Sequence, residues 1–378
     1  KGATERGLRM QDSAIWQFSL NALHAAGWGG SLLVALVVFA RYLRPRTLVI
    51  ATTVVTLALV MLGAYVRLTD AGLGCPDWPG CYGKLSPKHA AAEIRAAEAV
   101  APVGPVSLPK AWNEMLHRYV ASFVGVMIMA IAWQTLRRRR RDKPGADDPS
   151  AGIGLPLAMV GLVIAQGLFG KWTVTLLLKP VIVTLHLLGG MALVALLAWL
   201  TARHLYISGG QPSTLRAIRP WAVLGVVILV VQISLGGWVS TNYAGLACVD
   251  FPTCHGEWAP AMDFGQGFHF SRELGMTADG EALSNQALNA IHWAHRVGAL
   301  VTFAYLAILA HSAMRLRGLR RFGIAVLVLL LVQVTLGIAN VLASLPLPLA
   351  VAHNGVAALL LAALVMLNFA AYSPHNQR

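Results

Sequence analysis

Four histidines lie inside long apolar stretches of this 378-residue chain, where a titratable side chain is costly to bury. They form two equivalent pairs, His117 with His186 and His295 with His353. If the stretches are membrane-spanning helices, each histidine lies roughly 5–10 Å below the same surface. The imidazoles of a pair can then face each other, which suits the two axial positions of an iron porphyrin. The simpler alternative is a neutral histidine hydrogen-bonded between two helices.

The two pairs differ one helical turn before their first histidine. Glu114 precedes His117 by three residues, whereas His292 precedes His295 by three. Residues i and i+3 share a helix face, so a carboxylate accompanies only the first pair. It could move protons or stabilise positive charge on a reacting carbon. The first pair is therefore predicted to be catalytic and the second to be a redox or structural site. The alternative for Glu114 is a helix N-terminal carboxylate favoured by the helix dipole.

Basic side chains and glycines accompany the histidines. Arg118 and Arg296 each follow a histidine directly, and Lys171 and Lys179 lie near the same surface. They could meet the carboxylates of a porphyrin, or they could be snorkelling anchors. The small residues nearby, which suit either a flat macrocycle or close helix packing, are Gly125, Gly189, Gly190, Gly298 and Gly355.

The four cysteines share one spacing. Cys75 with Cys81, and Cys248 with Cys254, are each separated by five residues in a loop expected on the oxidising side of the membrane. Each pair is predicted to form a disulfide that closes a small loop over the outer end of the helices. A structural role is preferred, with a redox-active role as the alternative. The spacing differs from the C-x-x-C-H pattern of covalent haem attachment.

Composition fixes the class of protein. Hydrophobic residues make up 57% of the chain and charged residues only 12%, about half of what soluble domains carry. This excludes a soluble globular enzyme, a disordered chain and a small disulfide-stapled domain, and it predicts an all-α polytopic membrane protein. The net charge of +14 does not indicate nucleic-acid binding, because the basic residues gather at the ends of apolar runs.

Nine apolar stretches are long enough to span a bilayer. Two long loops, residues 67–113 and 240–287, separate some of them and contain the cysteines. The predicted spans are Ile15–Ala40, Thr47–Val66, Glu114–Leu136, Ile153–Leu176, Val181–Leu200, Trp221–Val239, Leu288–Leu309, Phe322–Ala343 and Leu347–Phe369.

Charge predicts the orientation of these spans. More than half of the Lys and Arg residues lie in alternate loops, around residues 41–46, 137–143, 203–219 and 315–321. The positive-inside rule places these loops in the cytoplasm. The C-terminus is then cytoplasmic, and both cysteine loops face outward.

An internal repeat organises the chain. Leu62–Val66 matches Leu235–Val239 at a shift of 173 residues (62 to 235), and both cysteine pairs match at the same shift. The two histidine pairs follow at shifts of 178 (117 to 295) and 167 (186 to 353). Two pseudo-symmetric four-helix bundles in the same orientation are predicted. The predicted domains are an N-terminal extension with an extra hydrophobic helix, residues 1–46, a first half, residues 47–202, and a second half, residues 203–378.

These motifs together resemble one family. The segment from Gly63 to Cys81, reading GAYVRLTDAGLGCPDWPGC, is followed by Glu114-x-x-His117-Arg118. Gly170-Lys-Trp-Thr-Val-Thr, His186-Leu-Leu-Gly-Gly, His295-Arg296 and His353 complete the set. Over about residues 50–370 the chain resembles the haem A synthases, the CtaA/Cox15 family.

The resemblance implies oxidation of the C8 methyl group of haem O to a formyl group by successive hydroxylations, giving haem A for terminal oxidases. It implies that His117 and His186 receive substrate haem O near Glu114, that His295 and His353 hold a haem b cofactor, and that both cysteine pairs match those of the family. Implied partners are membrane lipid, haem O synthase, terminal oxidase assembly factors and a second copy of the chain, but no nucleic acid. The implied location is the bacterial cytoplasmic (inner) membrane. Family members usually have eight spans, so the first predicted span is a departure.

Two other functions remain open from the residues alone. A dihaem b-type electron-transfer cytochrome would use the same histidine pairs and would not need Glu114. A transporter built from repeats usually has broken helices and polar sites at the membrane midplane, and neither is evident here.

Overall fold

The computed structural model describes residues 30–31, 34–36, 38–39, 41–142, 152–205, 207, 215–277 and 279–373. Over these residues the chain is helical, with isolated β-bridges and no strand. The predicted span Ile15–Ala40 lies largely outside the described residues. The prediction of an all-α protein is confirmed.

Eight of the described helices are long and apolar enough to cross a membrane. Each coincides with one of the predicted spans after the first. They are α2 (Pro45–Leu68), α4 (Leu108–Asp142), α5 (Gly154–Thr175), α6 (Pro180–His204), α8 (Arg219–Thr241), α10 (Asn285–Met314), α11 (Arg320–Leu342) and α12 (Leu347–Tyr372).

Local sequence explains how these helices begin and how polar residues fit inside them. Proline occupies one of the first two positions of α2, α6, α8 and α12, where its missing N–H costs nothing. In α2 the buried hydroxyls of Thr52, Thr53 and Thr56 each donate to the carbonyl four residues earlier, at 2.7–2.8 Å. Polar groups in an apolar helix are thus satisfied internally.

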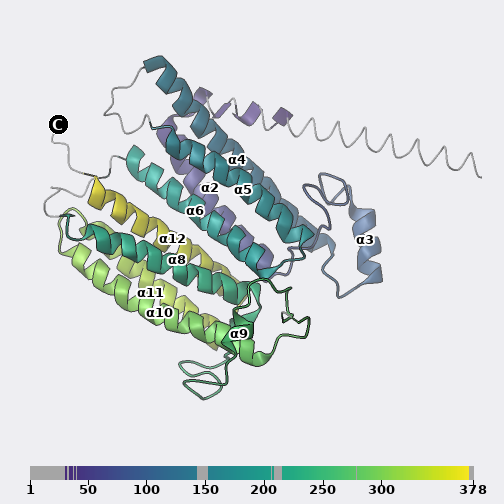
Figure 1. Cartoon of the computed structure of the whole chain (residues 1–378). Coiled ribbons are helices and arrows are strands. Elements are labelled where there is room, and N and C mark those ends of the chain that lie inside the picture. Colours follow the sequence, from purple (N-terminus) through teal and green to yellow (C-terminus); the bar gives the residue numbers. More distant parts are fainter. Residues whose placement is uncertain are drawn as a thin grey trace, which may run out of the picture.

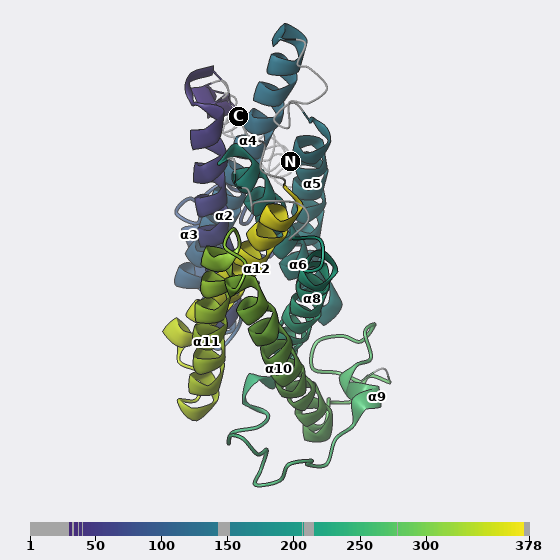
Figure 2. The ribbon, with the colours of Figure 1, turned by 90° about the vertical axis from the view of Figure 1, so that its left-hand side faces the viewer.

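The long helices pack in two sets of neighbours. In the first set α2 contacts α4, α4 contacts α5, α5 contacts α6, and α6 contacts α2. In the second set α8, α10, α11 and α12 are joined by the corresponding contacts. Helix α12 also contacts α2 and α6, and α6 contacts α8, so α12 lies between the sets and is the most buried long helix (Figures 1 and 2).

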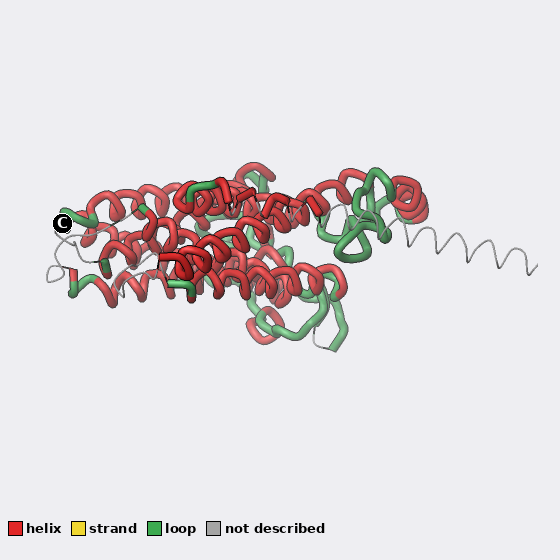
Figure 3. Tube along the Cα trace, turned by 90° about the horizontal axis from the view of Figure 1, so that it is seen from above, coloured by secondary structure: helices red, strands yellow, loops and turns green. Residues whose placement is uncertain are grey.

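The two long loops carry the short helices. The first contains α3 (Ala91–Val100), and the second contains η2 (Ala244–Leu246) and α9 (Phe264–Gly267). Both loops lie at the same end of the long helices, opposite the end where α12 finishes (Figures 1 and 3). The cysteines and the first turns of α4 and α10 therefore share one end of the molecule.

Candidate functional site

His117 on α4 and His186 on α6 face each other. Their ring centroids are 6.5 Å apart and the ring planes are inclined at 75°. The Nδ1 atoms of both rings are buried and have no hydrogen-bond partner. Two metal–nitrogen bonds of about 2 Å would place the centroids of two ligating imidazoles about 6 Å apart. The separation and the unpaired nitrogens therefore suit a six-coordinate porphyrin iron between the rings.

Each of the four imidazoles lies against a glycine of a neighbouring helix. At Gly63, Gly236 and Gly337 an added Cβ atom would lie closer to the histidine Cε1 atom than side chains normally pack, whereas at Gly170 it would make ordinary van der Waals contact. The contacts, with the distance from the added Cβ to Cε1, are Gly63 to His117 at 3.1 Å, Gly170 to His186 at 3.6 Å, Gly236 to His295 at 3.0 Å and Gly337 to His353 at 3.1 Å.

Glutamines contact the second pair of histidines. Gln232 Nε2 on α8 lies 3.0 Å from His295 Nδ1 and 3.0 Å from the His295 carbonyl oxygen. Gln333 Nε2 on α11 lies 3.1 Å from His353 Nε2. A glutamine amide nitrogen only donates, so His295 Nδ1 and His353 Nε2 accept in these two contacts, which hold the orientation of each ring. Nδ1 of His353 is buried and unpaired.

Three of the glycines named from the sequence lie tightly against side chains of neighbouring helices. A Cβ at Gly189 would lie 1.7 Å from Gln166 Nε2, and a Cβ at Gly298 would lie 2.3 Å from Gln232 Oε1. At Gly355 the nearest atom is the sulfur of Met61, at 2.9 Å. These positions admit large neighbouring side chains. The glycines that meet the imidazoles could have been found from the repeat, which aligns Gly63 with Gly236 and Gly170 with Gly337.

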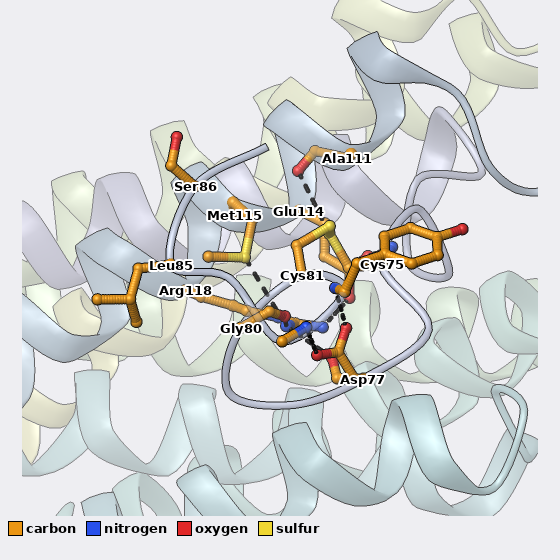
Figure 4. The surroundings of a disulfide bond; sticks show 12 residues. Cys75, Asp77, Gly80, Cys81, Leu85, Ser86, Ala111, Glu114, Met115 and Arg118 are labelled. Atoms are coloured by element: carbon orange, nitrogen blue, oxygen red, sulfur yellow. Dashed lines mark hydrogen bonds and ion pairs between the residues drawn. A yellow bond between two sulfur atoms is a disulfide. The ribbon is translucent and has the colours of Figure 1, made fainter. Parts of the chain in front are cut away.

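Glu114 joins α4 to the first cysteine loop. Its side chain is almost fully buried. One carboxylate oxygen accepts the backbone N–H of Cys75 at 2.8 Å, and the other forms an ion pair with Arg118 one turn later. Arg118 also donates to the carbonyl of Asp77 at 2.9 Å and to that of Pro79 at 3.2 Å (Figure 4). Thus Arg118 is directed at the cysteine loop.

The second half repeats this arrangement without the carboxylate. His292 Nδ1 accepts the backbone N–H of Cys248 at 3.3 Å. Arg296 donates to the carbonyl of Thr253 at 2.7 Å and to that of Cys248 at 2.9 Å. Glu114 and His292 each lie three residues before the first histidine of their pair. They thus occupy the same place against the first cysteine of their loops. Only in the first half is that residue a carboxylate.

Both predicted disulfides are present, Cys75–Cys81 and Cys248–Cys254. An aspartate organises each small loop. Asp77 accepts the backbone N–H groups of Tyr82 and Gly83 at 2.6 and 2.7 Å, and Asp250 accepts those of the equivalent residues at 2.6 and 2.9 Å. The Thr253 hydroxyl and these N–H groups hold the pKa of Asp250 well below its usual range.

Arg118→Leu is expected to destabilise the protein more than Arg296→Leu. Both changes remove hydrogen bonds to a cysteine loop, but only Arg118→Leu leaves a buried carboxylate, that of Glu114, without its ion-pair partner. Removing one partner of a buried pair costs about 3–5 kcal/mol, whereas lost hydrogen bonds to a charged group cost about 1.5–3 kcal/mol each. Thermal unfolding in detergent would measure the difference. An equal loss of Tm in the two variants would contradict it.

Lys171 is exposed on α5, and Lys179 forms an ion pair with Glu273 at 3.0 Å.

Sequence reasoning missed a cluster between the two sets of helices. Arg67 donates to the Ser240 carbonyl at 2.7 Å and lies over the Tyr243 ring at 3.9 Å, while the Tyr243 hydroxyl is 2.6 Å from Asp70. Burial and the hydrogen bond to Asp70 raise the pKa of Tyr243. Each hydrogen-bonded pair is separated by 173 residues, the shift of the repeat, which is the signal that could have found it.

Comparison with known proteins shows the family. Residues 46–365 match the cytochrome oxidase assembly protein family COX15-CtaA, from α2 to most of α12. The chain belongs to this family. It is 41% identical over 326 residues to a protein named heme A synthase from Shewanella oneidensis, covering 84% of this chain and 94% of that protein. It is also 29% identical to a heme A synthase from Rhizorhabdus wittichii, over 85% and 93% of the two chains, and 26% identical to one from Bacillus licheniformis, over 80% and 88%.

The region that matches the COX15-CtaA family includes the site described above. The matched region contains the four histidines with their glycines, Glu114, and both cysteine loops.

Proposed function

We propose that this chain is a haem A synthase, which oxidises the C8 methyl group of haem O to a formyl group for terminal oxidase biogenesis. Each of two hydroxylations replaces a C–H bond of the methyl carbon with a C–O bond and removes two electrons, so the reaction needs an electron acceptor and a source of oxygen from outside the chain. Loss of water from the resulting gem-diol then gives the formyl group. Relatives of that name at up to 41% identity support the activity. The observation that carries the proposal is the facing pair His117 and His186, with the spacing of two axial ligands.

The first half is proposed to bind the substrate haem. His117 and His186 would hold its iron. Glu114 lies one turn before His117, at the end of the helices that also carries the first cysteine loop. Its negative charge would stabilise positive charge at the reacting carbon or accept a proton released there. Arg118 would hold the carboxylate in place through their ion pair. We also propose that haem carboxylates are contacted by one or more of the basic side chains Arg118, Arg296 and Lys171.

The second half is proposed to bind a resident haem b. The hydrogen bonds of Gln232 and Gln333 hold two imidazoles that would ligate it. A bound haem of this kind supplies one-electron redox chemistry. The residues of this half bind and orient it, and His292 contributes no negative charge beside it.

The contacts between helices support a pseudo-symmetric arrangement of two four-helix halves with the domain limits given above. Each contact within the first set has a counterpart in the second, and the contact of α2 with α12 corresponds to that of α8 with α6. An axis along the membrane normal relates such parallel repeats. The cysteine loops are proposed to face outward and the C-terminus inward, in the inner membrane of a bacterium.

Extraction of haem from the purified chain tests the function. The chain would be expressed in a host that makes haem O but no haem A, and the extracted pigments separated by chromatography. Haem A or hydroxylated haem O is the expected product. Haem b together with unreacted haem O would instead indicate a dihaem cytochrome, and absence of any haem would indicate a transporter.

A further inference from the structure

The seam between α4 and α5 is less filled with side chains than the equivalent seam between α10 and α11. Helices α10 and α11 pack closely along their length, whereas α4 and α5 are less closely packed, and α5 is the least buried of the eight spanning helices. The proposed function gives each half a haem, so a porphyrin alone does not require the two seams to differ. The difference points to a part of the ligand that only the first half binds.

Two glycines of the first half replace larger residues of the second. On α5, Gly167 corresponds to Val334 at the repeat shift of 167. On α4, Gly125 corresponds to Phe303 at the shift of 178. The Phe303 side chain packs against the hydrophobic core of the second half. The first half therefore has less side-chain volume at both positions of its seam.

Gly167 lies on the face of α5 that is turned toward α4 and the imidazoles. It follows Val163 by four residues and precedes Gly170 by three, so the three positions share one helix face. Val163 is the side chain that a Cβ at Gly125 of α4 would contact, at 3.4 Å. Gly170 is the residue that lies against the His186 ring. A Cβ added at Gly167 would have no atom of another helix within 4 Å in the described part of the chain. Gly167 thus borders open space one turn deeper than the contact with His186.

The imidazoles, independently of the glycines, point to a ligand beside this seam. His117 and His186 face each other at 6.5 Å, and their Nδ1 atoms are buried and unpaired. A porphyrin has two propionates on one edge, and this charged edge belongs at the outer end of the helices, because charge is costly inside a bilayer. The apolar edge of the macrocycle then points toward the membrane interior. In haem O this apolar edge carries a long isoprenoid tail, which haem b lacks.

We infer that the seam between α4 and α5, bordered by Gly125, Val163 and Gly167, takes the isoprenoid tail of haem O and so distinguishes this substrate from haem b. This inference rests on the proposed function. Gly125 follows His117 by eight residues on α4, so the seam extends about 12 Å deeper than that imidazole. Apolar helix faces and adjoining lipid suit an apolar chain of this length. In the second half, the side chains at the equivalent seam occupy the room that a tail would need.

Titration with two haems that differ in the tail tests this inference. The full-length chain carrying His295→Ala and His353→Ala would be titrated in detergent with haem O and, separately, with haem b. The Soret band then reports ligation by the first pair of histidines alone. Gly167→Val, which introduces the second-half residue, should weaken haem O binding about tenfold, the effect of forcing additional carbon atoms into a filled space. Binding of haem b should stay within twofold, because it has no tail to displace.

Gly161→Val in the same background is the matched control. Gly161 also lies on α5 and also corresponds to a valine, Val328, but it is exposed and lies off the helix face that carries Val163 and Gly167. The same substitution there should change neither affinity. Gly167→Ala adds a single carbon atom and should weaken haem O binding less than Gly167→Val does. Normal binding of haem b reports that each variant is folded.

Three results would overturn the inference. These are unchanged haem O binding in both Gly167 variants, equal weakening of haem O and haem b in both, and the same loss of haem O binding from Gly161→Val. If the first pair of histidines bound neither haem before any glycine was replaced, the proposed function would fall as well. Normal binding of haem O with unaltered glycine variants would remove this inference alone.

Discussion

Glu114→Gln is expected to stop conversion of haem O while the protein still binds haem. The amide oxygen of glutamine can still accept the Cys75 N–H, so the cysteine loop keeps its anchor, but the negative charge beside His117 is lost. Positioned acid–base groups contribute about 10²–10⁴-fold to a reaction rate. Haem A formed per hour, measured by chromatography of extracted pigments, should fall by a factor in this range, and the visible spectrum of the bound haem should be nearly unchanged.

Glu257→Gln is the control for this change. Glu257 is exposed in the second cysteine loop, so its replacement should leave the yield of haem A at the wild-type value. A normal yield from Glu114→Gln would remove Glu114 from the mechanism. Loss of bound haem in that variant would instead assign Glu114 a role in holding the loop over the site.

Replacement of the four histidines should separate the two sites. His295→Ala and His353→Ala are expected to remove about half of the bound haem and to abolish conversion, because a six-coordinate iron loses an axial ligand. His117→Ala and His186→Ala should also abolish conversion but keep the low-spin spectrum of the second-half haem. Haem content per protein and electron paramagnetic resonance would measure both effects.

His311 provides the matched control for these substitutions. It is exposed near the end of α10, well away from the cysteine loops along the helix, so His311→Ala should retain full haem content and activity. Unaltered spectra in all four variants of the paired histidines would end the proposal that they bind iron.

Much of the fold could be predicted from sequence, because runs of apolar residues directly report helices that cross a bilayer. The predicted ends of the helices were less accurate than their positions in the sequence. The third predicted span begins at Glu114, whereas α4 begins at Leu108, since Lys110 and Asn113 are compatible with a helix that emerges from the membrane. The same helix continues beyond Leu136 through a run of arginines, which are good helix formers. Hydropathy therefore locates the apolar part of a helix and not its termini.

The sequence identified which residues belong to the candidate site, but it did not predict which of them contact each other. The repeat identified the histidines and Glu114, and the oxidising side identified the disulfides. The bond from Cys75 N–H to Glu114, however, joins residues 39 positions apart through a loop, and no periodicity reports such a contact. Likewise, Gln166 and Gln333 are equivalent in the repeat, but Gln166 lies against Gly189 whereas Gln333 lies 3.1 Å from His353.

The cluster around Arg67 predicts how the two copies of the repeat would associate if they were separate polypeptides. Arg67 and Ser240 occupy equivalent places in the two copies of the repeat, as do Asp70 and Tyr243, and yet they contact each other. In a homodimer assembled from one copy, a residue at such a contact would meet its own twin, so arginine would face arginine and aspartate would face aspartate. Because the two copies differ in sequence, these equivalent places can hold complementary side chains. Each copy expressed as a separate polypeptide should therefore associate with the other copy in preference to itself.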